Sequence, residues 1–209
     1  MSEPMQLLDY IKAKKLLEEY GIHSIESSYV SDAGQAIGFS RGRPIVMKVL
    51  SEKQLHKSKA GLVRLNLATP KDITDAYNDL HRKAERIKPY KIIVQTMSEP
   101  GNEIIIGGRT DPQFGKVILI GLGGIYVEVF RDFALRVAPL SKYDTEDMLA
   151  QLKSRKIITH DGIHTRLIED LIRKVAKLMQ DNDSINELDL NPVIITDKGY
   201  QIVDIRILK

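Results

Sequence analysis

The chain has 209 residues, of which 43% are hydrophobic, 28% are charged and none is cysteine. Such a length suits one large domain or two small lobes. Without cysteine there are no disulfides, thiolate nucleophiles or thiolate metal ligands, and we expect a cytosolic location. The 31 basic and 28 acidic residues leave a net charge of +3, too small to indicate nucleic-acid binding. No apolar run approaches the ~20 residues of a membrane span and no secretory leader is recognisable, so we expect no membrane contact.

The first hundred residues predict helices and strands in alternation. Thr69-Pro70 is the clearest helix start, because threonine supplies an N-cap oxygen and proline suits the first helical position. Gly21 follows an amphipathic run and is typical of a helix end. We expect helices over residues 5–20, 31–40 and 69–87, and strands over residues 29–30, 44–50, 61–67 and 91–97.

The second half changes to closely spaced strands, over residues 103–110, 116–120, 125–130 and 133–137, which indicate an antiparallel meander. Helices over residues 145–154 and 162–181 and strands over residues 186–196 and 200–208 follow. Strands and helices mix without strict alternation, so we predict an α+β fold in which a mixed sheet carries helices on one face. A change of composition near Pro100-Gly101 predicts a hinge between two lobes.

Two basic features stand out in the first lobe. Lys48 lies within an apolar strand, where it either reaches water from a sheet edge, as its position alone favours, or points into a polar site. His56 lies among lysines in the segment 51–61, where a neutral imidazole can accept a phosphoryl group and lysines favour a phosphate. A solvated basic loop explains the same residues, and spacing alone favours that interpretation.

Two polar features stand out in the second lobe. The run Gly121–Gly124 would let backbone N–H groups approach an anion, but it lacks the ending of a Walker loop, and a glycine-rich hairpin turn explains it equally well. Glu187, Asp189 and Asn191 alternate along one strand and therefore share a face. Asp204 lies in the apolar strand that follows. Mg²⁺ takes such groups together with substrate phosphates, and a salt-bridged strand end is the alternative.

Five ordered runs fit one known pattern over nearly the whole chain, from about Leu8 to Ile205. They are Lys48 to Leu67 with His56-Lys57-Ser58, Glu103–Gly107, Asp111–Gly115, Gly121–Leu140 with Val127-Glu128-Val129, and Glu187–Pro192 with Asp204. These runs resemble the ATP-grasp β subunit of NDP-forming acyl-CoA synthetases, the ADP-forming acetyl-CoA synthetase group. The resemblance implies an ATP-grasp fold of two α+β lobes that clasp a nucleotide. Residues 1–97 would comprise an N-terminal part and the first lobe with its mobile His56 loop, and residues 98–209 the second lobe with the metal site.

The resemblance also implies a reaction and a partner. Acyl-CoA, ADP and phosphate would give the free acid, CoA and ATP, reversibly and with Mg²⁺. In this family, α-type domains carry the CoA-binding and acyl-transfer chemistry, and we expect this chain to be too short to contain them. The resemblance therefore implies a separate α subunit that carries these domains, in an α₂β₂ assembly.

By the same resemblance, each candidate site residue has a role. The nucleotide would be held by Lys48 at its phosphates, by the segment Gln95, Thr96 and Met97 beside its adenine, and by Glu103 nearby. Asn191 and Asp204 would ligate Mg²⁺, with Asp189 as a further candidate through water. His56 would take phosphate from an α-subunit phosphohistidine and pass it to ADP.

Two positions depart from the family pattern, which more often has Asp and Gly where this chain has Lys59 and Leu62. Lys59 makes the loop more basic, and Leu62 removes a flexible position. Two alternatives stay open. A nucleotide-binding regulatory ATP-grasp module without turnover would predict damaged ligands, whereas Lys48, His56, Asn191 and Asp204 are present. An ATP-grasp ligase with a self-contained site would need a second substrate domain.

Overall fold

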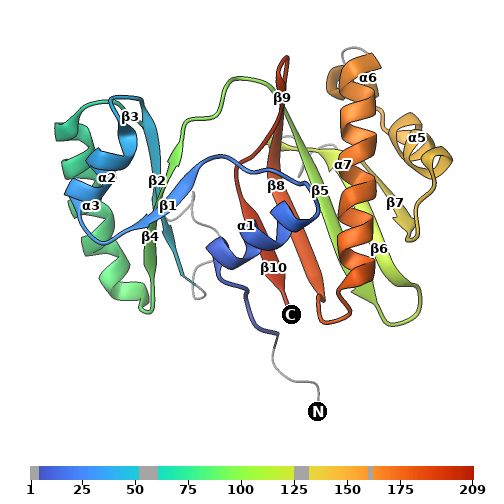
Figure 1. Cartoon of the computed structure of the whole chain (residues 1–209), viewed down its shortest axis with the longest axis horizontal. Helices are drawn as coiled ribbons and strands as arrows, with labels where there is room; N and C mark the ends of the chain where they lie inside the picture. The colour runs from blue at the N-terminus through green and yellow to red at the C-terminus, as the bar shows by residue number, and fades with distance from the viewer. Residues whose placement is uncertain (1–4, 52–60, 125–131, 160–161) are drawn as a thin grey trace. The chain divides into compact units, whose positions relative to one another are not determined.

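The computed structural model describes residues 5–51, 61–124, 132–159 and 162–209 (Figure 1). Contacts divide the chain into two compact units, Ile25–Ser98 and a second that joins Met1–Ser24 to Glu99–Lys209. The sequence grouped an N-terminal part with the first lobe over residues 1–97, whereas residues 5–24 pack with the later unit. The reason is a backbone ladder with the chain's end, in which Leu8 N donates to Ile207 O at 2.8 Å.

The unit Ile25–Ser98 has a four-stranded antiparallel sheet in the order β1-β4-β2-β3, with helices α2 and α3 on one face (Figure 1). Met47, Val49 and Leu80 lie in the core between sheet and helices. Helix α3 begins where the sequence predicted, because Thr69 and Asp72 form a capping box. The elements are β1 (Ser27–Val30), α2 (Ala33–Ser40), β2 (Ile45–Leu50), β3 (Val63–Leu67), α3 (Pro70–Ala84), the 3₁₀ helix η1 (Glu85–Ile87) and β4 (Lys91–Thr96).

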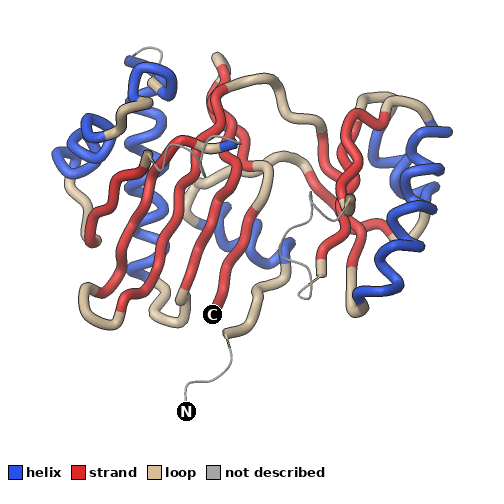
Figure 2. The backbone as a smooth tube through the Cα atoms, turned by 180° about the vertical axis from the view of Figure 1, so that it is seen from behind, coloured by secondary structure: helices blue, strands red, loops and turns tan. Residues whose placement is uncertain are grey.

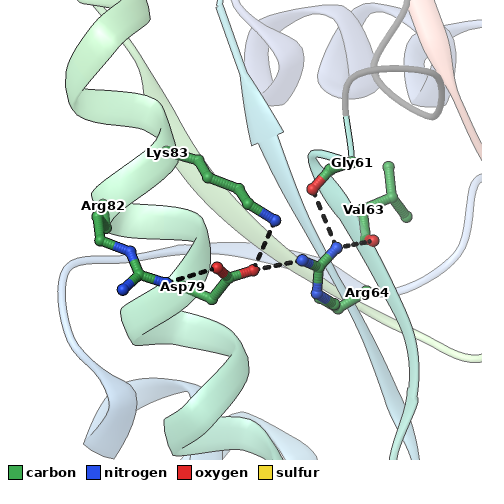
Figure 3. A network of polar contacts seen from close by, with 6 residues as sticks. All are labelled: Gly61, Val63, Arg64, Asp79, Arg82 and Lys83. Carbon is green, nitrogen blue, oxygen red and sulfur yellow. Dashed lines mark hydrogen bonds and ion pairs between the residues drawn. The ribbon is translucent and has the colours of Figure 1, made fainter.

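A polar network ties strand β3 to helix α3 (Figure 3). The carboxylate of Asp79 accepts hydrogen bonds from Arg64, from Arg82 Nη2 at 3.0 Å and from Lys83 Nζ at 2.9 Å. Arg64 Nη1 also donates to the carbonyl oxygens of Gly61 and Val63, each at 2.9 Å. The network therefore fixes residues 61–64 against α3, at the point where the segment with His56 rejoins the sheet.

Asp79→Asn is expected to lower the free energy of unfolding by about 1–2 kcal/mol at pH 7, because it removes the charge that three cations share. Hydrogen bonds from Lys83, and then from Arg82 and Arg64, hold the pKa of Asp79 at about 2. A depressed carboxyl pKa stabilises the fold above about pH 4, and this contribution is lost as the pH falls toward 2. Urea titrations at pH 7 and pH 3 would measure it. Asp75→Asn, an exposed carboxylate on the same helix, is the control, and equal losses in both variants would contradict the prediction.

The larger unit is a six-stranded antiparallel sheet in the order β10-β8-β5-β6-β7, with β9 paired to β8. Its helices lie on one face, and Figure 2 shows the other face free of helices. Its elements are α1 (Tyr10–Glu19), β5 (Asn102–Asp111), β6 (Gly115–Leu122), β7 (Phe133–Val137), α5 (Lys142–Gln151), α6 (Arg155–Ile158), α7 (Gly162–Asp181), β8 (Glu187–Thr196), β9 (Gly199–Ile202) and β10 (Ile205–Leu208).

The α+β class is confirmed, but the mixed sheet is wrong. Every pairing of named strands in the described parts of both sheets is antiparallel. Hairpins join β5 to β6 and β8 to β9, and none of these pairs needs a crossover helix. The strand expected over residues 125–130 lies outside the described residues.

Helix α7 covers the middle of the larger sheet. Its predicted apolar stripe is buried, with Ile168, Leu171 and Val175 fully excluded from water. Gly108 of β5 lets the helix approach, because an added Cβ would lie 2.6 Å from Met179 Cγ. The helix expected over residues 145–154 instead spans α5 and ends at Gln151, before the short α6. In the described part of the chain, no helix is both long and apolar enough to cross a membrane.

Candidate nucleotide and metal site

The two predicted metal ligands are neighbours at a break in the sheet. The sequence predicted one strand over residues 200–208, but it is interrupted at Asp204, between β9 and β10. Pro192 of β8 explains the interruption, because proline has no N–H to donate across the ladder. Asn191 N instead donates to Asp204 O at 3.3 Å, and Val203 N donates to Pro192 O at 3.1 Å. The break places half-buried Asp204 beside exposed Asn191.

Asp189 lies on the same face of β8 as Asn191 and belongs to a crowded group of carboxylates. Burial first, and then the charges of Glu187 and Asp204, raise the pKa of Asp189 to about 6. Arg206 lowers it by a smaller amount. Carboxylates that repel one another at a half-buried position are stabilised by a cation placed among them.

This donor set fits Mg²⁺. The ion prefers oxygen ligands and is usually held by one or two carboxylates, with waters and substrate phosphates completing its shell. Asp204 and Asp189 supply carboxylates, and Asn191 supplies an amide oxygen. Within the described ranges, no three Asp, Glu, His or Cys side chains form a metal-holding group by themselves. Asn191, Asp204 and Asp189 would thus supply part of a coordination shell, to which a nucleotide would add its phosphate oxygens.

A cavity of about 540 Å³ opens on the sheet face opposite helix α7. Glu187, Asp189 and Asn191 line one side of it, which confirms that the three alternate onto one face. The other side is apolar and comes from β6 and β7, and Arg109 of β5 also lines the cavity. The sequence did not single out Arg109, although its alternation with Gly107 and Asp111 would have placed it on this face. Glu103 and Asp204 do not line the cavity.

Glu103 lies at the start of β5, opposite Ile194 of β8. Its carbonyl oxygen accepts a hydrogen bond from Gly123 N at 2.8 Å. Gly121 and Leu122 are the last residues of β6, and Gly123 packs against the protein's own backbone. The N–H of Gly123 is used within the fold, so the anion-binding interpretation is wrong for that residue.

Lys48 and Gln95 are the candidate nucleotide-binding residues of the smaller unit that lie inside its sheet. Lys48 is only 6% exposed, and β2 lies between β4 and β3, so the sheet-edge interpretation is wrong. Val46 pairs with Gln95 and Lys48 pairs with Ile93, which puts Lys48 and Gln95 diagonally on one face. Their neighbours Met47 and Val94 point into the helix-covered core. A buried ammonium is costly unless it has acceptors, and this supports the polar-site interpretation.

The segment predicted beside the adenine is the end of β4 and the residue that follows. Gln95 is fully buried, and Thr96 is the last residue of the strand. Met97 Sδ accepts from Asn66 N at 3.4 Å. The division between the two units follows immediately, after Ser98, two residues before the predicted hinge at Pro100.

The structure describes some of the histidines that the sequence contains, but not all of them. His56 lies outside the described residues, as do His160, Lys59 and Glu128. In the sequence, His23, His81, His160 and His164 fall in turns or on polar helix faces, which predicts surface positions, and His23 and His81 are exposed. The surface prediction for His164 is wrong, because it is 8% exposed and its Nε2 lies 3.2 Å from Thr196 O. The sequence assigns no role to Arg136, and in the structure it pairs with Asp147 of α5. Leu62, one of the two departures from the family pattern, lies in the core of the smaller unit.

The chain belongs to the ATP-grasp family, because the model of the ATP-grasp domain matches residues 1–208. It is similar to the β subunit of ADP-forming acetate–CoA ligase II from Pyrococcus furiosus, with 34% identity over 94% of this chain and 89% of that protein. The ADP-forming 4-hydroxybutyrate–CoA ligase of Nitrosopumilus maritimus is 31% identical over 94% of this chain, which covers 30% of that longer protein.

Solved structures agree with this assignment. Acetyl-coenzyme A synthetase 1 of Ca. Korarchaeum cryptofilum, in complex with coenzyme A and Ca-AMPCP, matches with a TM-score of 0.87 and 37% identity over 98% of this chain and 93% of that chain. A second structure of that enzyme holds Mg-AMPPCP, with its phosphohistidine segment pointing towards the nucleotide-binding site, and matches with a TM-score of 0.82 and 36% identity over 97% of this chain and 92% of that chain. The predicted family and fold are confirmed.

Proposed function

We propose that this chain is the nucleotide-binding β subunit of an ADP-forming acyl-CoA synthetase. The observation that carries the proposal is its similarity to the β subunit of an ADP-forming acetate–CoA ligase, which is 34% identical over 94% of this chain and 89% of that protein. The enzyme would convert acyl-CoA, ADP and phosphate to the free acid, CoA and ATP. The step assigned to this chain is phosphoryl transfer between a phosphohistidine and ADP.

The described residues suit that step. Lys48 would hold the nucleotide phosphates, since a buried ammonium interacts more strongly with a phosphate than an exposed one. Asn191 and Asp204 would hold Mg²⁺, and Asp189 would act through water. When bound, Mg²⁺ neutralises the charge that develops on the transferred phosphoryl group. Gln95, Thr96, Met97 and Glu103 would bind the nucleoside end.

A partner would supply the remaining chemistry. The separate β subunits among the relatives imply an α partner, and this chain covers only 30% of the longer 4-hydroxybutyrate–CoA ligase. We propose an α₂β₂ assembly in which an α-subunit phosphohistidine hands its phosphate to His56. A cytosolic location stays a prediction. A regulatory module without turnover would keep the fold and the nucleotide site but would not move phosphate.

Phosphate transfer tests the proposal. The complex of this chain with its α subunit is expected to form ATP from acyl-CoA, ADP and phosphate, and His56→Ala is expected to lose at least ~10³-fold of that activity while ADP affinity stays unchanged. His81→Ala, which alters an exposed histidine of the same unit, is the control. Full activity in His56→Ala would overturn the relay. Mg²⁺-dependent ADP binding with no turnover by the wild-type complex would favour the regulatory module.

A further inference from the structure

The turn after β6 approaches Glu103 with its backbone. An added Cβ at Gly123 would lie 2.8 Å from the carbonyl carbon of Glu103 and 2.9 Å from its oxygen, distances that side chains do not adopt. Without a side chain in the way, the backbone N–H of Gly123 donates a hydrogen bond to the carbonyl oxygen of Glu103 at 2.8 Å. The two backbones can come so close only because position 123 is glycine.

Gly124 approaches the side chain of the same glutamate. Its φ is +71°, in the left-handed region that favours glycine. An added Cβ would lie 2.8 Å from Oε2 of Glu103 and 3.5 Å from its Cδ. The carboxylate of Glu103 therefore occupies the space that any side chain at position 124 would fill.

Ordinary turn glycines in this chain have no such neighbour. Gly115 has φ +80° and Gly199 has φ +143°, and neither would bring an added Cβ within 4 Å of another atom. Those two positions need glycine for the backbone of the turn alone. At Gly124 the left-handed backbone and the carboxylate contact occur together, so the turn itself does not account for the contact.

The start of β5 is also held from its other side. An added Cβ at Gly101 would collide with the carbonyl oxygen of Ile195, so β5 and β8 lie unusually close there. β8 is the strand that carries Asn191. The backbone of Glu103 thus lies between β8 and the glycine turn. The missing side chain of Gly124 leaves the space in which the carboxylate of Glu103 lies.

We propose that the Gly123-Gly124 turn is a positioning element of the nucleotide site, which holds the carboxylate of Glu103 where it meets the bound nucleotide. The proposal rests on the proposed function, which puts Glu103 at the nucleoside end. A carboxylate accepts hydrogen bonds from nucleotide O–H or N–H groups, and these weaken steeply as distance and angle depart from their best values. A carboxylate already held in place also loses less conformational freedom on binding.

Calorimetric titration of Mg²⁺-ADP into the full chain tests the proposal with four variants. Gly124→Ala is expected to weaken binding about five- to tenfold, because the new methyl group displaces Oε2 of Glu103. Gly115→Ala is the matched control, since it carries the same left-handed strain in open space, and its affinity is expected to equal the wild type. Glu103→Ala is expected to weaken binding as well, and adding Gly124→Ala to it is expected to change nothing further.

The outcomes separate the inference from the function on which it rests. If Glu103→Ala binds ADP like the wild type, the assignment of Glu103 to the nucleotide is wrong. If Glu103→Ala is weakened but Gly124→Ala is not, or if the two losses add, the positioning role alone is overturned. Thermal melting of each variant without ADP detects loss of fold. If Gly124→Ala does not fold, Glu103→Asp replaces it: a carboxylate too short to lie over Gly124 is expected to lose a similar factor, and full affinity would overturn the proposal.

Discussion

Lys48→Met is expected to weaken Mg²⁺-ADP binding by about 10- to 150-fold, the equivalent of about 1.5–3 kcal/mol for a lost hydrogen bond to a charged group. Methionine follows the lysine side chain as far as Cε, with sulfur in place of Cδ, and lacks the ammonium, so packing on β2 changes little. The large effect follows from burial. At 6% exposure, the Lys48 ammonium would act on a phosphate with little screening by water.

Isothermal titration with Mg²⁺-ADP at two salt concentrations measures the effect. Lys91→Met on the neighbouring strand β4 is the control, since Lys91 is exposed and lies 4.6 Å from the centre of the Tyr29 ring. Its ADP affinity is expected to stay within about twofold of the wild type. An unchanged affinity in Lys48→Met, with the fold intact by circular dichroism, would remove Lys48 from the phosphate site.

Sequence patterns were most informative where a local signal determined the local structure. Thr69 and Pro70 predicted the start of α3, and the alternation of Glu187, Asp189 and Asn191 predicted their common face on the cavity. Both depend on neighbours within four residues. Burial of Lys48 was missed because it depends on strand order: only the structure shows that β2 is flanked by β4 and β3.

Long-range contacts explain the other differences between the sequence predictions and the structure. Residues 5–24 pack with the later unit because the backbone of Gln6 and Leu8 pairs with the last residues of the chain. A local sequence pattern gives no information about a partner about 200 residues away. The interruption at Asp204 arises from Pro192 on the facing strand, so the apolar run from Ile202 to Ile207 gave no sign of it. His164 looked like a polar helix residue, but its ring meets the backbone of β8 at Thr196.

Asp189→Asn is expected to stabilise the Mg²⁺-free protein above pH 6, by up to about 3 kcal/mol. The pKa of Asp189 is raised from 3.8 to about 6, and two pKa units correspond to about 3 kcal/mol. The direction in which the stability of the wild type changes with pH follows from proton binding. Between pH 4 and 6 the folded carboxyl holds its proton while the unfolded one has lost it, so stability falls as the pH rises through that window. Asparagine keeps the shape of the side chain and carries no charge to repel its neighbours.

Mg²⁺-ADP is expected to narrow the difference in stability between Asp189→Asn and the wild type. If the carboxylate cluster holds the metal with the nucleotide, wild-type protein gains stability from Mg²⁺-ADP as RT ln(1 + [L]/Kd). Asp189→Asn has less negative charge at the site, so its gain is expected to be smaller. Functional carboxylates held close together are commonly destabilising in the empty protein, which is the trade-off expected of a site selected for binding.

Chemical denaturation at pH 4, 5, 6 and 7, with and without Mg²⁺-ADP, measures both effects. Asp197→Asn, in the exposed turn between β8 and β9, is the control and is expected to show neither. The electrostatic account requires that the two curves of wild type and Asp189→Asn meet near pH 4 and diverge above it. A constant difference at every pH would instead indicate a packing effect of the amide. Equal stabilisation of both proteins by Mg²⁺-ADP would mean that Asp189 takes no part in holding the metal, and would leave Asn191 and Asp204 as the protein's own ligands.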